Sequence, residues 1–376
     1  MLYRFGSDIQ VTSLKRLLGR TLLLGSISVL ILWLTWFFWP VGQNNSQVPT
    51  PTEYLDIHVH VAGLGNRGSG CFVSKEMCEN IRFPIFLWAM GTSIEQLETQ
   101  GDTILIKSLS QRLVESKRVG RAVILAMDGV VDQKGELDRA LTQVYIPNSF
   151  VATQTALYDN LLFGASVNPL RHDALARLDA VRAQGALLIK WIPAMMHIDP
   201  SDNRFIPFYR RLVELGLPLL SHAGQERSFP GARDEFGDPE KLILPLELGV
   251  TVIAAHIATT GEYEGQASME RLTPMFARYQ NLYADLSSLT QINKLDYLTD
   301  VLQTPGIGQR LLYGSDWPLQ FYPLIHPLYH LPDIGIGEAR TITELDNAWD
   351  RDVAIKEALG VPEEVFLRGE KLLLGQ

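Results

Sequence analysis

Eight short apolar runs, separated by amphipathic stretches, restrict the fold of this 376-residue chain more than any other feature of its sequence. Buried parallel strands appear as continuous apolar runs, and their alternation with helices is typical of strand–helix–strand units. Two of the stretches between the runs, 174–184 and 208–215, are typical of helices. The runs read YLDIHVH, RAVILAM, LLFGASV, ALLIKW, LPLLSH, VTVIAAH, NLYADL and RLLYGSD. We therefore predict an α/β fold.

The spacing of the runs narrows this prediction to a closed barrel. The last five runs end at intervals of 30 to 34 residues, which accommodates one strand, one helix and two loops. Eight such units predict a (β/α)₈ TIM barrel over residues 53–376. A doubly wound open sheet is the alternative, and it usually carries a glycine-rich phosphate loop after its first strand. Four glycines follow the first run, but their spacing differs from that of a dinucleotide-binding loop, namely Gly63, Gly65, Gly68 and Gly70.

Residues 21–39 form a stretch of nineteen residues without a charge. As a helix this stretch is long enough to cross about 30 Å of hydrocarbon, and three tryptophans crowd its C-terminal half, as in interfacial belts. A cleaved signal peptide is the alternative, but the apolar core is long for one and no small-x-small cleavage site follows. We predict one N-terminal transmembrane helix over 21–39, followed by a polar linker over 40–52.

Basic residues precede this predicted helix. Lys15, Arg16 and Arg20 lie before it, and the next basic residue is Arg67. The positive-inside rule then predicts a cytoplasmic N-terminus over residues 1–20, with the catalytic domain outside, or periplasmic if the source is bacterial.

Charge and cysteine content add limited information. The formal net charge is −9, and no basic stripe indicates nucleic-acid binding. The two cysteines, Cys71 and Cys78, are compatible with a disulfide in an exported domain and equally with two free thiols. No pattern indicates the oligomeric state.

Polar side chains end several of the apolar runs. His58 and His60 form an H-x-H pair whose rings project to one side, because strand side chains alternate. The C-terminal ends of the strands of a barrel converge at one mouth. We therefore expect the polar residues that end later runs to meet this pair; they are Lys190, His222, His256 and Asp316.

The sequence resembles the amidohydrolase superfamily, closest to the branch often called amidohydrolase-related, which includes uncharacterised hydrolases and aromatic-acid decarboxylases. The resemblance covers the chain from Tyr54 onward, in segments whose order matches the family: DIHVH, SVNP, GALLIKWIP, LGLPLLSHAG, VIAAHIATTG and LLYGSDWP. It implies that four of the residues above bind a metal ion, namely His58, His60, His222 and Asp316. By the same resemblance, His256 binds a second metal or polarises the substrate, and Lys190 is carboxylated to bridge two metals or remains beside one.

These residues indicate a metal-dependent hydrolase acting on a small-molecule ester, lactone or amide. One or two ions are expected, with Zn²⁺ first because imidazole-rich sites suit it and other divalent transition metals as alternatives. Zinc lowers the pKa of bound water from about 15.7 to about 7, and Asp316 can carry the proton to the leaving group while His256 assists.

Two other functions stay open at this stage. The first is metal-dependent non-oxidative decarboxylation of a small aromatic or unsaturated acid, with Arg67 or Arg82 holding the carboxylate. The second is a membrane-tethered binding protein with an inactive barrel. We rank the binding protein last because no expected ligand residue is missing.

The predicted topology is tested by protease protection. If residues 21–39 are an anchor with the catalytic domain outside, protease added to intact spheroplasts or equivalent cells should digest the domain, because no bilayer shields it. Immunoblotting of the C-terminal region measures this digestion, and a cytosolic protein serves as the lysis control. Protection of the C-terminal domain in intact cells would contradict the topology.

Overall fold

The computed structural model describes residues 54–229, 231–331 and 333–375. The predicted cytoplasmic segment, transmembrane helix and linker all lie outside these residues. Within the described part of the chain, no helix combines the length and the hydropathy needed to cross a membrane. The anchor over 21–39 therefore stays a prediction.

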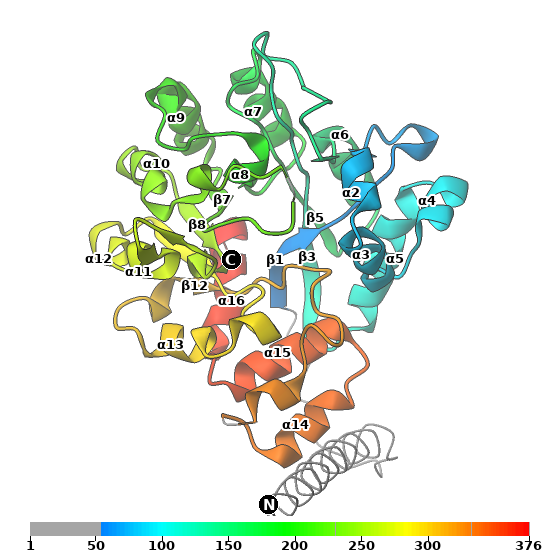
Figure 1. Cartoon of the computed structure of the whole chain (residues 1–376), viewed down its shortest axis with the longest axis vertical. Helices are drawn as coiled ribbons and strands as arrows, with labels where there is room; N and C mark the ends of the chain where they lie inside the picture. Colours follow the sequence, from blue (N-terminus) through cyan, green and yellow to red (C-terminus); the bar gives the residue numbers. More distant parts are fainter. Residues whose placement is uncertain (1–53, 230, 332, 376) are drawn as a thin grey trace, which may run out of the picture. The chain divides into compact units, whose positions relative to one another are not determined.

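Eight parallel strands form a closed barrel at the centre of the described domain (Figure 1). Hydrogen-bonded ladders connect β1 to β3 and β5 in one arc, and β6, β7, β8, β11 and β12 in the other. Parallel bridges close the two gaps, Ala165 with Ile189 and Val59 with Trp317. The strands are β1 (Tyr54–His60), β3 (Val119–Leu125), β5 (Leu161–Gly164), β6 (Ile189–Trp191), β7 (Leu219–His222), β8 (Val252–Ala255), β11 (Leu282–Asp285) and β12 (Leu311–Leu312). Each of the eight apolar runs overlaps one of them, and the predicted barrel is confirmed.

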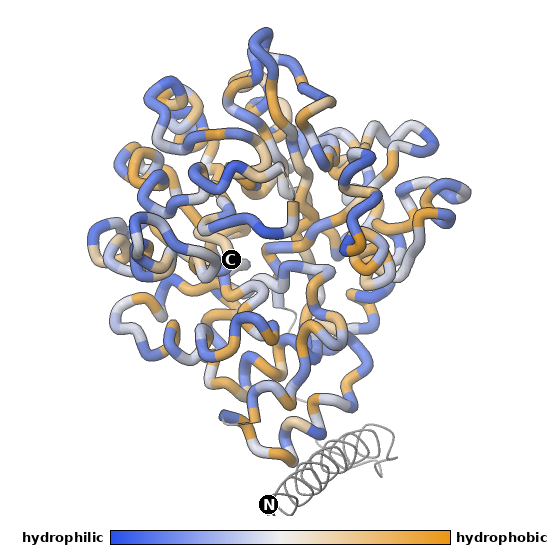
Figure 2. Tube along the Cα trace, in the orientation of Figure 1, coloured by the Kyte–Doolittle hydropathy of each residue, from blue (hydrophilic) through white to orange (hydrophobic). Residues whose placement is uncertain are grey.

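Helices surround the barrel strands, and apolar segments concentrate along the strands while polar segments mark the outer loops (Figure 2). The two helices expected from the sequence are present as α7 and α9, and α9 ends at Gly216, which has a φ of 62° typical of helix C-termini. The α-helices after β1's long loop are α5 (Thr103–Glu115), α6 (Asn148–Thr155), α7 (Ala174–Ala183), α8 (Pro193–Met196), α9 (Ile206–Leu215), α10 (Ile243–Glu247), α11 (Ser268–Leu272), α12 (Met275–Arg278), α13 (Tyr297–Gln303), α14 (Ile336–Thr343), α15 (Ala348–Ala358) and α16 (Glu363–Leu374).

The segment after β1 has structure that the sequence patterns did not predict. It contains η1 (Asn66–Gly68), β2 (Phe72–Val73), α2 (Lys75–Glu79), α3 (Arg82–Ala89) and α4 (Ile94–Gln100), and β2 pairs with β4 (Val144–Tyr145). The Asp102 carboxylate organises its first turn by accepting hydrogen bonds from the backbone of Leu64 and Gly65 and from the Ser69 hydroxyl. Cys71 and Cys78 are both free thiols, so the disulfide alternative is not realised.

Two histidines after β12, His326 and His330, are buried rather than at the surface, where the sequence alone would place them. The Nδ1 atom of His326 accepts a hydrogen bond from the backbone of Leu328 at 3.1 Å, at the start of the 3-10 helix Pro327–His330. Burial, and next the charge of Arg351, lower the pKa of His326 to about 4. The folded chain therefore holds a neutral imidazole where the unfolded chain binds a proton below pH 6.5.

This difference predicts a loss of stability in acid. Because the pKa of His326 is lower in the folded chain than in the unfolded chain, protonation favours unfolding. The stability is complete above the unfolded-state pKa of 6.5 and is lost as pH falls from 6.5 toward about 4. Between pH 7.5 and 5.0 the loss from His326 amounts to about 2 kcal/mol. In His326→Asn the amide oxygen can still accept the Leu328 N–H but does not titrate. Urea unfolding of both proteins at the two pH values should show a smaller pH dependence in the variant, and equal pH dependence would contradict the assignment.

Candidate metal centre

Three side chains at the junction of the first and last strands place ligand atoms around one point. The Nε2 atoms of His58 and His60 are 3.1 Å apart, and the Oδ1 atom of Asp316 lies 3.6 Å and 3.4 Å from them. All three atoms lie within 4.8 Å of one another, a separation that suits ligands of a single ion. The sequence prediction that these residues converge is confirmed as geometry, while their role as ligands stays a prediction.

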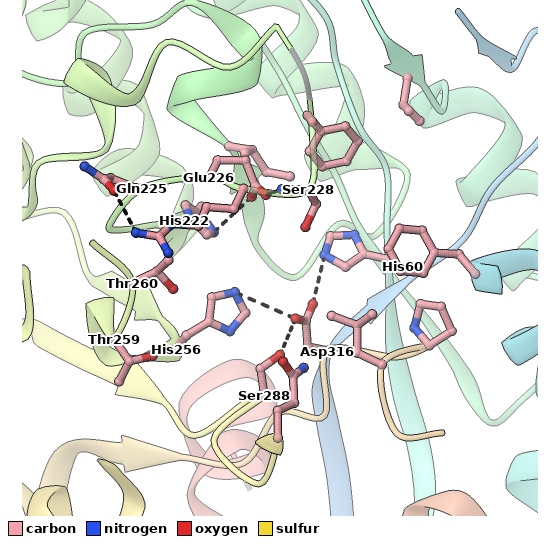
Figure 3. A pocket seen from close by; sticks show the side chains of 18 of the residues that line it. His60, His222, Gln225, Glu226, Ser228, His256, Thr259, Thr260, Ser288 and Asp316 are labelled. Atoms are coloured by element: carbon pink, nitrogen blue, oxygen red, sulfur yellow. Dashed lines mark hydrogen bonds and ion pairs between the residues drawn. The ribbon is translucent and has the colours of Figure 1, made fainter. Parts of the chain in front are cut away.

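Backbone pairing between β1 and the end of β12 sets this arrangement. The Asp316 N–H donates to the carbonyl of His58 at 2.9 Å, and the His60 N–H donates to the carbonyl of Trp317 at 3.0 Å. Asp316 adopts a positive φ of 63°, which is uncommon outside glycine and turns its carboxylate toward the histidines. The Ser288 hydroxyl donates to the Asp316 Oδ2 atom at 2.5 Å and fixes the other oxygen (Figure 3).

Asp285 fixes the tautomer of His58. Its Oδ2 atom lies 2.8 Å from His58 Nδ1, and its Oδ1 atom accepts the His256 N–H at 2.8 Å. Burial raises the pKa of Asp285, but the His58 ring and the hydrogen bonds outweigh it, so this pKa lies below its usual value and the carboxylate is ionised. His58 therefore donates through Nδ1 and directs its Nε2 lone pair into the site, as histidine ligands of metals do. The sequence patterns did not predict this contact between Asp285 and His58.

His256 is oriented in the same manner by Ser287. The Ser287 hydroxyl donates to Asp285, so its oxygen accepts from His256 Nδ1 at 2.7 Å. The His256 Nε2 atom then presents a lone pair 3.9 Å from Asp316 Oδ2. His256 therefore lies at the mouth as predicted, and it is an acceptor there.

His222 lies beside His256, with ring centroids 5.3 Å apart. Its Nδ1 atom lies 3.6 Å from Glu226 Oε2, and its Nε2 atom is buried without a hydrogen-bond partner in the described part of the chain. A buried imidazole nitrogen without a partner is costly, and a metal ion would satisfy it. This orphaned atom is compatible with a divalent cation, but His222 is not in the group of His58, His60 and Asp316 whose ligand atoms lie within 4.8 Å of one another, so its role as a ligand stays a prediction.

Lys190 projects into the same site from β6. Its Nζ atom is 3.0 Å from His58 Nε2, and the side chain is almost fully buried. Burial lowers the pKa of Lys190 to about 8, although the charges of Asp285 and Asp316 oppose the shift. Lys190 therefore deprotonates more easily than a surface lysine, as carboxylation requires, but its bridging role stays a prediction.

The electrostatics of the imidazoles also suit a cation. Burial, followed by neighbouring groups, lowers the pKa of His60, His222 and His256, in the first and last cases to well below the ordinary value. The three rings are therefore neutral at pH 7, and each has one unprotonated nitrogen that can bind a cation. Neutral imidazoles with one carboxylate are a donor set that suits zinc, manganese and related ions.

A cavity of about 740 Å³ opens over these residues. The segment after β1 supplies one apolar wall, with Met77, Phe83, Phe86 and Met90. Lining residues on other loops include three that sequence reasoning missed, Glu226, Gln291 and Lys294. These three lie four or more residues beyond the runs LPLLSH and NLYADL, so the strand pattern does not place their side chains.

A model of the protein family described as amidohydrolase matches residues 122–335, more than half of the chain. The chain belongs to the amidohydrolase family. It is therefore a TIM-barrel enzyme of the amidohydrolase superfamily, which uses divalent metals and acts on small-molecule substrates. No curated protein matches the chain.

The first two of the following solved structures share the fold of this amidohydrolase, and the third is a weaker match. An uncharacterised TIM-barrel protein from Bordetella bronchiseptica is 15% identical with a TM-score of 0.52, and the match covers 81% of this chain and all of that one. A probable 2-pyrone-4,6-dicarboxylic acid hydrolase from Acinetobacter baumannii, with citric acid bound, is 14% identical with a TM-score of 0.53, covering 86% of this chain and all of that one. A dihydroxybenzoic acid decarboxylase from Polaromonas with bound manganese and an inhibitor is 15% identical with a TM-score of 0.45, covering 85% and 98%.

The contact between Asp285 and His58 generates a prediction about metal affinity. Asp285→Asn keeps the size of the side chain but removes the charge that fixes the His58 tautomer, so Zn²⁺ affinity should fall 10- to 100-fold, the usual effect of losing such a partner. Competition with a fluorescent chelator measures this affinity. Glu262→Gln is the control, because Glu262 lines the cavity but is exposed and outside the cluster. Equal affinities in the parent and Asp285→Asn would contradict the role of Asp285.

Proposed function

We propose that this amidohydrolase is a metal-dependent hydrolase of a carboxylic ester, lactone or amide, anchored to a membrane by residues 21–39. The observation that carries the reaction is the convergence of His58 Nε2, His60 Nε2 and Asp316 Oδ1 at the floor of a cavity large enough for a small molecule. The probable 2-pyrone hydrolase of similar fold adds support, since a 2-pyrone is a cyclic ester. The anchor is supported by the uncharged stretch alone.

Four residues would hold the ion, namely His58, His60, His222 and Asp316. Their support is the Nε2 atoms of His58 and His60, 3.1 Å apart, the nearby Asp316 carboxylate and the orphaned His222 Nε2 atom. A bound divalent cation supplies Lewis acidity and a nucleophile derived from water at neutral pH. We propose Zn²⁺ first, with manganese as the main competitor.

Asp316 is the proposed proton carrier. The Ser288 hydrogen bond holds Oδ2, and Oδ1 faces His58 and His60, so the carboxylate lies where an attacking water would release its proton. A positioned carboxylate can accept that proton and return it to the leaving group.

His256 is proposed to act as an acceptor. Because its Nδ1 atom donates to Ser287, its Nε2 atom can accept a hydrogen bond from water or the substrate, or bind a second ion. A neutral ring of this tautomer has no proton to give a substrate carbonyl. The orientation therefore favours these roles over the polarising role that the resemblance also allowed.

Decarboxylation is the competing reaction at the same site. The two arginines named for it from the sequence do not line the cavity: Arg67 donates to the carbonyl of Thr99, and Arg82 to that of Arg227. Lys294 does line the cavity, but an ammonium paired with the carboxylate stabilises the ground state more than the transition state for its loss. The two reactions differ in their products, because only decarboxylation releases carbon dioxide.

Asp316→Asn tests the proposed hydrolysis. The amide keeps the shape of the side chain but cannot accept the proton, so activity on a panel of lactones, esters and amides should fall by about 10²–10⁴. The metal content should remain near that of the parent, and Glu262→Gln should retain activity.

Both activity and bound metal must be measured on the same preparations. A metallated Asp316→Asn protein with nearly full activity would reject the proton-carrier role. If the Asp316→Asn variant is metal-free, the experiment shows only that Asp316 is a ligand. If the parent protein releases carbon dioxide, the proposed reaction is decarboxylation and not hydrolysis.

A further inference from the structure

The cavity contains a buried ammonium group that no residue of the described chain neutralises. Lys294 is 8% exposed and lines the cavity, in the short 3-10 helix Ile292–Lys294 after β11. Within the described ranges, no carboxylate lies within ion-pair distance of its Nζ atom and no side-chain hydrogen bond forms there. The Nζ atom is not among the buried atoms that lack a partner, so it reaches the open space of the cavity. An ammonium at the cavity wall without a carboxylate in ion-pair contact is suited to binding an anion that enters the cavity.

Gln291 provides a second donor in the same turn. Its side chain is 5% exposed and lines the cavity, and its Nε2 atom is buried without a hydrogen-bond partner in the described part of the chain. The Lys294 N–H donates to the carbonyl of Gln291 at 2.9 Å, which closes a single 3-10 turn. Both side chains line the same cavity from this turn. An ammonium and an amide donor can each donate a hydrogen bond to one oxygen of a carboxylate.

The acidic groups of the cavity are already engaged elsewhere. Glu226 accepts the Ser228 N–H at 2.7 Å through one oxygen, and its other oxygen faces His222. Asp316 is held by Ser288 and the histidines, and Glu262 is exposed. Burial lowers the pKa of Lys294, while Asp316, Glu226 and Asp285 raise it without pairing with it.

The opposite side of the cavity is apolar. Met77, Phe83, Phe86 and Met90 come from the segment after β1, whereas Lys294 precedes α13. The two helices that mark these walls, α3 and α13, lie on different sides of the barrel mouth (Figure 1). A ligand spanning the cavity meets a hydrocarbon surface at one end and paired donors at the other, with the metal-binding residues on the floor.

We propose that Lys294 Nζ and Gln291 Nε2 form a subsite for a carboxylate that the reaction leaves intact, so that the substrate is an amphiphilic acid whose apolar part contacts the Met77–Met90 wall. This inference rests on the proposed hydrolase function, which places the cleaved bond beside Asp316.

Electrostatics explain why a carboxylate bound to Lys294 would remain unchanged during the reaction. Decarboxylation moves the negative charge from the carboxylate into the rest of the molecule. An ammonium paired with that carboxylate would stabilise the ground state more than the transition state, which slows the reaction. A carboxylate that keeps its charge gains binding energy in both states. Buried donors also reject analogues without the matching group, so the pair would act as a specificity determinant.

Binding to the metal-free full-length chain tests the subsite separately from catalysis. The probes are 3-phenylpropanoate and its neutral isostere 3-phenylpropanamide, titrated calorimetrically after chelator treatment so that no ion can hold the carboxylate. The parent should bind the acid at least tenfold more tightly than the amide. Lys294→Met should remove this preference by weakening the acid about tenfold while the amide changes less than twofold, and Lys294→Arg should retain most of it.

Lys190→Met is the matched control, because Lys190 is the other buried ammonium of the cavity. A preference that survives Lys294→Met, or that disappears in Lys190→Met alone, would overturn the subsite. Equal affinities in the parent, or binding of neither probe, would overturn the substrate class. Retained amide binding shows that each variant is folded. Because no turnover is measured, a chain that prefers the acid yet hydrolyses nothing would reject the proposed function and leave the subsite standing.

Discussion

Closure of the barrel between its last and first strands is the constraint on which the site depends. The hydrogen bonds from Asp316 to His58 and from His60 to Trp317 bring together residues from opposite ends of the domain. The register is strict, because a one-residue shift would turn each side chain to the other face. Gly314 allows the close approach, since a Cβ atom there would lie 2.9 Å from that of His58. The buried Asp56 carboxylate joins the same seam by accepting the N–H groups of His58 and Ser315 and the Trp349 indole.

Backbone strain is concentrated at the same edge. Five non-glycine residues at the ends of β8, β11 and β12 have positive φ angles, namely His256, Ile257, Ala258, Ser288 and Asp316. Such conformations cost about 1–3 kcal/mol each and persist where surrounding contacts over-determine them. Here the acceptors are buried and fixed, as with Asp285 for the His256 N–H. The barrel therefore offsets the strain with hydrogen bonds that also set the direction of each imidazole lone pair. The site is organised before any ligand binds.

Sequence reasoning succeeded where a residue's position follows from the strand pattern. All eight apolar runs overlap barrel strands, and His58, Lys190, His222, His256 and Asp316 meet because strand ends converge. It failed where position depends on tertiary contacts between loops. The wall after β1 is built from short helices, and the turn before them is held by hydrogen bonds from Leu64 and Gly65 to the Asp102 carboxylate, a contact that no periodicity predicts. Asp285 is an intermediate case. Its strand was predicted from the sequence, but its hydrogen bond to His58 was not, because that bond joins strands that are far apart in the sequence.

The residues proposed for catalysis and those proposed for substrate specificity lie on different kinds of structure in this cavity. The donors proposed to bind the metal end or follow barrel strands, so the pairing of the barrel sets their positions. Gln291 and Lys294 lie beyond β11 in one short turn, and the apolar wall lies on the short helices after β1. Loops of this kind can change without loss of the core, which is why barrels host many reactions at one end. The proposed preference for an acid could therefore be altered at the turn while the geometry around Asp316 is kept, by replacing the ammonium of Lys294.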